Sequence, residues 1–70
     1  MMENTYKIID DFPVKTMRAL VLDREYEFGD CEYAEIDGKK YHFTLNYGFR
    51  TILLPDMANV SFKGKIVSFV

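Results

Sequence analysis

The feature that most constrains the fold is the pair Asp37-Gly38, which stands between two alternating segments, residues 31–36 and 39–46. Asp-Gly supplies the two positive-φ positions of a type I′ turn at the least steric cost, so it predicts a two-residue β-hairpin. The turn also fixes the register, because Ile36 must then face Lys39 and each earlier residue must face the next one along.

This register assigns every hairpin side chain to one of two faces. The aromatic and aliphatic face must be the core side, and it carries Ala34, Ile36, Tyr41, Phe43 and Leu45. The opposite face is predicted to be exposed, and it carries Cys31, Tyr33, Glu35, Lys40, His42 and Thr44.

Length and composition limit the chain to one small domain over residues 1–70. Apolar residues make up 49% and aromatic residues 16%, which suits a compact globule and argues against disorder. The single cysteine, Cys31, cannot form an internal disulfide. No segment approaches the roughly 18 apolar residues of a membrane helix, and the first residues lack the basic and apolar regions of a signal peptide. We therefore expect a cytoplasmic protein that does not contact membranes.

The charge is unevenly distributed although the net charge is only −2. Residues 23–37 carry seven acids and one base, whereas residues 38–70 carry five bases and one acid. The predicted turn folds the acidic segment onto the basic one and sets Glu35 opposite Lys40, so the two segments compensate each other. An acidic surface presented to a basic host protein, as in a small inhibitor of the type that mobile elements carry, stays open as an alternative.

The remaining segments complete a predicted five-stranded meander. The run Ala19-Leu20-Val21-Leu22 is typical of a strand covered on both faces. Residues 55–59 have room for one helical turn with Pro55 at its start, and Gly64 is expected to mark a bulge or bend. The predicted strands are residues 14–23, 31–36, 39–46, 49–54 and 60–70. Such a chain is expected to close into a small all-β barrel that hides its edges.

An α+β alternative remains open for residues 13–27. Met17, Leu20 and Val21 lie on one helical face that begins after Pro13. Leu22 and Ala19 fall off that face, so the strand is the better interpretation.

The last residues, Lys65 to Val70, form an apolar β-prone run that would template aggregation as an open edge. Residues 6–9 have matching β propensity, and we expect them to pair with this run and close the barrel. The competing arrangement is a homodimer through the C-terminal strand. A monomer is favoured, because a tethered partner is present at high effective concentration.

Three segments resemble motifs of the SH3-like barrel. Residues 18–23 (Arg-Ala-Leu-Val-Leu-Asp) look like that family's Ala-Leu-Tyr-Asp-Tyr strand, residues 28–30 (Phe-Gly-Asp) look like its Phe-x-x-Gly-Asp element, and residues 54–60 resemble its helical turn before the last strand. Signalling members of the family bind proline-rich ligands through aromatic side chains. Here the two opening tyrosine positions read Val21 and Asp23, and the chain has no Trp. The resemblance thus implies barrel topology and argues against proline-rich ligands.

No constellation predicts catalysis, a cofactor or a metal. Cys31 and His42 are a possible thiol–imidazole pair, but no third group orients them, and two ligands do not make a structural zinc site. We expect a non-enzymatic module that binds an unidentified protein through Tyr33, His42, Tyr47 and Phe49, the composition of a modest contact patch. A nucleic-acid-binding barrel is the other alternative, which the acidic pI near 5.2 disfavours.

Overall fold

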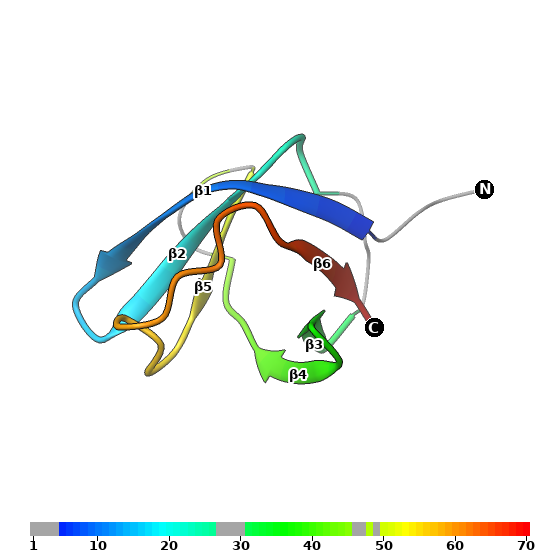
Figure 1. The fold of residues 1–70 in the computed structure, drawn as a ribbon. Helices are drawn as coiled ribbons and strands as arrows, with labels where there is room; N and C mark the ends of the chain where they lie inside the picture. The colour runs from blue at the N-terminus through cyan, green and yellow to red at the C-terminus, as the bar shows by residue number, and fades with distance from the viewer. Residues whose placement is uncertain (1–4, 27–30, 46–47, 49) are drawn as a thin grey trace.

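The structure, a computed structural model, describes residues 5–26, 31–45, 48 and 50–70, and over these residues it is an antiparallel β-sheet (Figure 1). Its six strands are β1 (Thr5–Val14), β2 (Met17–Leu22), β3 (Tyr33–Ile36), β4 (Lys39–His42), β5 (Thr51–Leu54) and β6 (Ile66–Phe69). The described residues contain no helix, so the all-β prediction is confirmed. The alternative helix at 13–27 is wrong over residues 13–26, which contain the end of β1, a turn, β2 and a segment that is not helical.

The strand order is β4-β3-β6-β1-β2-β5, which is not the five-stranded meander that the sequence suggested. The last strand, β6, lies between β3 and β1 instead of at an edge. The N-terminal strand β1 is long enough to serve two neighbours: it pairs with β6 through residues 5–7 and with β2 from Ile8 onward. An irregularity between Ile8 and Asp10 marks the bend between these two pairings.

The hairpin is confirmed residue by residue. Strands β3 and β4 pair Ile36 with Lys39 and Glu35 with Lys40, and the same register continues to Tyr33 and His42. Asp37 and Gly38 have φ values of 55° and 80°, the two positive values that a type I′ turn requires.

The core lies on the inner face of the curved sheet. Its buried cluster consists of Tyr6, Ile8, Leu20, Leu22, Ala34, Ile36, Ile52, Leu54, Phe62, Val67 and Phe69. Tyr41 and Phe43 pack against this cluster as predicted, with edge-on ring contacts to Phe62 and Phe69.

Leu45 does not join the core as predicted, because 39% of its surface is exposed. The ladder of β4 ends at His42, and Thr44 instead forms an isolated bridge with Leu53 of β5. Beyond that bridge the alternation of faces no longer determines where a side chain points.

Cys31 does not lie on the exposed face as predicted, because its half-buried side chain packs against the core. The amide N–H groups of Glu32 and Tyr33 both donate to the carbonyl of Val70, at 2.9 and 3.1 Å. Two successive donors on one acceptor are the pattern of a β-bulge, which interrupts the alternation of faces at this point.

The predicted pairing of the two ends of the chain is confirmed: Tyr6 faces Val67 and Lys7 faces Ile66. The predicted strand over 60–70 is wrong in its first half. The bulge or bend predicted at Gly64 is confirmed. Gly64, at φ 87°, lies in a tight turn closed by a hydrogen bond from Lys65 N to Phe62 O (3.0 Å). Gly64 N donates to Ile8 O (2.8 Å) and Ile8 N donates to Lys65 O (2.9 Å), so two residues face one, which is the pattern of a β-bulge with glycine at its first position.

The sheet is not closed into a barrel. Its end strands, β4 and β5, meet near one isolated bridge, where Thr44 and Leu53 exchange hydrogen bonds of 2.9 and 3.0 Å. If this ladder continued, His42 would face Pro55. Proline has no N–H to donate, and the chain turns at Asp56, whose φ is 59°. This turn also replaces the helical turn predicted at 55–59, because a left-handed residue interrupts a right-handed helix.

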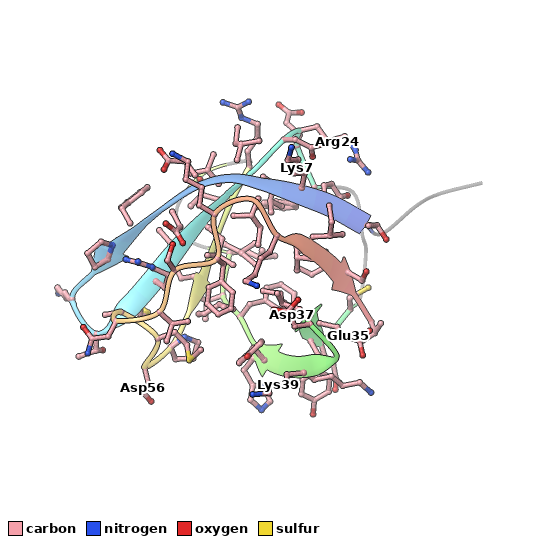
Figure 2. All side chains as sticks on the ribbon, in the orientation of Figure 1. Lys7, Arg24, Glu35, Asp37, Lys39 and Asp56 are labelled. Atoms are coloured by element: carbon pink, nitrogen blue, oxygen red, sulfur yellow. The ribbon has the colours of Figure 1, made fainter. Side chains whose placement is uncertain are left out.

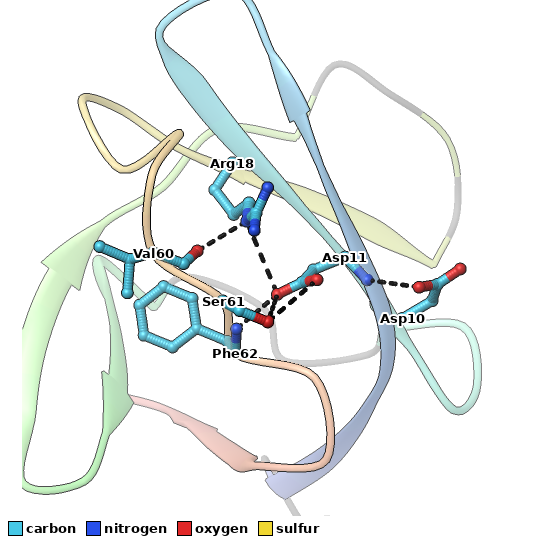
Figure 3. A network of polar contacts seen from close by, with 6 residues as sticks. All are labelled: Asp10, Asp11, Arg18, Val60, Ser61 and Phe62. Atoms are coloured by element: carbon cyan, nitrogen blue, oxygen red, sulfur yellow. Dashed lines mark hydrogen bonds and ion pairs between the residues drawn. The ribbon is translucent and has the colours of Figure 1, made fainter.

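A polar cluster fastens the segment before β6 to β1 (Figure 3). The Asp11 carboxylate accepts hydrogen bonds from the Ser61 hydroxyl at 3.1 Å and from the Phe62 amide. The Arg18 guanidinium lies 3.6 Å from the same carboxylate and donates to the Val60 carbonyl at 2.6 Å. These contacts take the place of a strand ladder along residues 60–62.

Candidate protein-interaction surfaces

Tyr33 and His42 lie together on the exposed face of the β3–β4 hairpin. They face each other across the two strands, and their ring centroids are 4.9 Å apart at an interplanar angle of 46°. His42 is exposed and Tyr33 is half-buried. The hairpin register therefore brings two of the four predicted contact residues into one small aromatic surface.

The other two predicted contact residues, Tyr47 and Phe49, lie outside the residues that the structure describes. The aromatic surface on the hairpin is therefore defined by Tyr33 and His42.

Charges around the hairpin largely compensate each other. Glu35 faces Lys40 across the strands as predicted, and the Asp37 carboxylate in the turn forms a salt bridge with Lys65 at 2.8 Å. Figure 2 shows Glu35, Asp37 and Lys39 grouped around the hairpin. On β4 itself Lys39 and Lys40 are exposed and no residue is acidic, so the outer strand of the hairpin is cationic.

A second surface lies on the outer face of β1, β2 and β5, the side that points away from the core. Residues that face each other across the three strands share this side of the sheet. They form three rows: Asp10–Val21–Thr51, Phe12–Ala19–Leu53 and Val14–Met17.

This outer face is mostly apolar. Ala19 is 0% exposed and Leu53 is 5% exposed, yet neither belongs to the core cluster. Phe12 is 36% exposed, and Val14, Met17 and Val21 are half-buried. The part of this face that stays accessible includes Val14, Met17 and Val21, and these apolar side chains suit contact with another molecule.

The sequence analysis did not place a site here, although a signal was present. The apolar run Ala19–Leu22 predicted a strand covered on both faces. Leu20 and Leu22 point into the core, whereas Ala19 and Val21 point outward. The flanking strands β1 and β5 could not be assigned to the same face before their registers were known.

Cys31 and His42, the possible thiol–imidazole pair, lie in different environments. Cys31 packs against the core, whereas His42 stacks on Tyr33 at the exposed face. Among residues 5–26, 31–45, 48 and 50–70, no three His, Cys, Asp or Glu side chains form a group that could hold a metal ion. The same part of the chain contains no helix with the length and apolar character that a membrane crossing requires.

Comparison with protein-family models, with curated proteins and with solved structures found no match to this chain.

Proposed function

We propose that this protein is a non-enzymatic interaction module that binds another protein through the β3–β4 hairpin. The observation that carries the proposal is the stacked pair Tyr33–His42, which lies on an exposed face beside the sheet's outer strand β4. Aromatic side chains that are already ordered lose little conformational entropy when they are buried in a contact, which suits them to anchor an interface.

The apolar outer face of β1, β2 and β5 supports the same class of function. It offers a second contact area on the opposite part of the sheet, where Val21 and Met17 are half-buried side chains of the middle strand β2. We expect a monomer in the free state. Strand β6, the proposed dimer edge in the competing arrangement, has β1 on one side and β3 on the other.

An SH3-like relationship is a proposal at the level of topology. Support comes from the antiparallel sheet of short strands whose ends approach at the bridge between Thr44 and Leu53. The turn at Asp56 weakens it, because the resemblance implies a helical turn there. Proline-rich ligands are not part of the proposal.

Two other functions receive less support. A nucleic-acid-binding barrel needs a basic surface with stacking aromatics, but Tyr33 and His42 lie beside Glu32 and Glu35 on a chain of net charge −2. An acidic inhibitor surface needs unpaired carboxylates, but Asp23 and Asp37 form salt bridges with Arg24 and Lys65.

The test is affinity capture from a lysate of the source cell with three baits: the parent protein, Tyr33→Ala and His42→Ala. Both substitutions remove side chains from the exposed face, so unfolding midpoints should stay close to that of the parent. We expect at least one protein that the parent retains and that both variants lose.

Met17→Lys is the matched control, because it alters the outer face and leaves the hairpin intact. Loss with Met17→Lys and retention with both hairpin variants would move the binding site to the outer face. Retention of nucleic acid in place of protein would contradict the proposed function altogether.

A further inference from the structure

The edge of β4 has a defined hydrogen-bonding phase. The N–H and C=O groups of Tyr33 bond with Val70, next to β6, at 3.1 and 3.0 Å. Backbone groups of successive residues in a strand point to opposite sides, so Ala34 and Ile36 point toward β4. Their partners Tyr41 and Lys39 point back toward β3, and the backbone groups of Lys40 and His42 therefore point away from the sheet.

Thr44 verifies this phase, because it is the next residue in the same alternation. Its N–H and C=O groups also point away from β3, and they bond with Leu53 of β5. The described residues supply no such partner to the backbone of Lys40 or His42. We call the free backbone edge of Lys40 and His42, together with the turn at residues 55–57 across from it, the open seam.

The open seam exists because β5 cannot continue along β4. In the register of Thr44 and Leu53, the residue across from His42 is Pro55, which has no N–H, and Asp56 then turns the chain away. In Figure 1 the strand β4 and the end of β5 diverge beyond the bridge. The seam is thus an interruption of the ladder at a defined register.

We infer that this seam accepts an extended segment of another protein by antiparallel strand addition to β4, and that the segment alternates acidic and apolar side chains. This inference rests on the proposed function and specifies which kind of protein segment the module would bind. Strand addition satisfies the backbone groups of Lys40 and His42 directly, which is the recurring mode of peptide recognition at exposed sheet edges.

The alternation follows from the two sides of β4. Residues across from Lys40 and His42 would share their exposed face, where an acidic side chain would lie beside the Lys40 ammonium. The intervening residues would lie on the inner face beside Tyr41, which packs on the core and contacts the Phe62 ring. Apolar side chains suit that position.

A second copy of this chain fits the seam less well. In a two-fold pairing of two β4 strands centred on Tyr41, Lys40 of one copy faces His42 of the other. Neither lysine then gains a carboxylate across from it. A partner with acidic residues supplies one, and opposite charges across a strand pair stabilise it.

The test uses a synthetic heptapeptide, Glu-Val-Glu-Val-Glu-Val-Glu with blocked ends, titrated into ¹⁵N-labelled protein. We expect the amide signals of Lys40 and His42 to shift and their hydrogen exchange to slow. Lys40→Glu should weaken binding at least about tenfold and raised salt should weaken it further. Lys63→Glu, which removes an exposed lysine outside the hairpin, should have little effect.

Two methylated peptides test the hydrogen-bonding phase itself. N-methylation of the Glu residues removes the donors that face β4 and should abolish binding, whereas N-methylation of the Val residues should be tolerated. The inference would be overturned if the two methylated peptides bound equally well. It would also be overturned if a Lys-Val heptapeptide bound as tightly as the Glu-Val peptide, or if no binding occurred at millimolar peptide.

Protection of Lys40 and His42 without peptide, together with a dimer in sedimentation, would also overturn it in favour of a second copy. The proposed function fails separately, in the capture experiment. The capture experiment could yield a protein partner that depends on Tyr33 and His42 while the heptapeptide does not bind. That result would support the interaction module and contradict strand addition at β4.

Discussion

At the scale of single residues, the Asp11 side chain links β1 to the segment that precedes β6. Only 6% of that side chain is exposed, and its carboxylate joins a β1 residue to the Ser61 hydroxyl, the Phe62 amide and the Arg18 guanidinium. A buried donor that loses its acceptor retains the full cost of its desolvation, so the cluster should be sensitive to substitution.

We expect Asp11→Ala to lower the free energy of unfolding by about 2–4 kcal/mol, because it removes the acceptor of the Phe62 amide and the ion-pair partner of Arg18. Asp10→Ala is the matched control, since its exposed carboxylate accepts a hydrogen bond from its neighbour's amide at the surface and should cost less than about 1 kcal/mol. Urea denaturation followed by tyrosine fluorescence measures both. Equal effects would show that the cluster contributes nothing beyond a surface charge.

Gly38 tests the hairpin turn. Nothing lies within 4 Å of a Cβ atom built at this position, so any cost of substitution comes from its φ of 80° and not from a clash. Gly38→Val should lower stability by roughly 1–2 kcal/mol or more, because β-branched residues resist positive φ, whereas Gly38→Asn should cost much less. Thermal melts compare the two variants, and coincident melting temperatures would contradict the type I′ turn.

At the scale of elements, local chemistry was enough to predict some pairings and not others. The hairpin register followed from two turn residues, and the pairing of β1 with β6 followed from an apolar run that needed a cover. The insertion of β6 between β3 and β1 depends on contacts across the whole chain, such as Ala34 with Phe69, for which the sequence holds no local signal.

Of the candidate contact surfaces, one could be predicted from the sequence and the other could not. Tyr33 and His42 could be placed on one face because a single turn sets their register, and their ring contact is the result. The outer face could not be predicted, because it requires the register of β1 and β5 on β2 at the same time. Cys31 was misplaced because a bulge at the Val70 carbonyl carries no signature of its own.

Strand β1 should protect β6 from intermolecular pairing. Deleting residues 1–9 removes the partners of Val67 and Ile66, and we expect the truncated protein to dimerise or precipitate, because its apolar edge is then free. Size-exclusion chromatography measures the outcome. Lys7→Glu, which keeps the β1 backbone in place, should remain monomeric, and a truncated protein that stays monomeric and equally stable would contradict this role of β1.

At the scale of the whole molecule, a small domain without an internal disulfide depends on packing alone for its stability. The apolar outer face and a net charge of only −2 both favour association at high concentration. The surface that supports the proposed contact is therefore also the surface most prone to nonspecific contact.

We expect Met17→Lys to reduce concentration-dependent association, because it introduces a charge onto this face at the first residue of β2. Thr16→Lys adds the same charge one residue earlier, in the exposed turn between β1 and β2, and should have a smaller effect. Sedimentation velocity over a series of concentrations separates the two. Identical behaviour of both variants would assign the association to net charge and not to the outer face.

The central position of β6 has a consequence for folding kinetics. This strand joins the β3–β4 hairpin to β1, and its partners, residues 5–7 and the pair Ala34 and Glu35, lie far from it in the sequence. Pairings between residues so distant in the sequence require the closure of long loops and slow the folding of a domain. We therefore expect the hairpin to form early and the docking of β6 to limit the rate at which the sheet is completed.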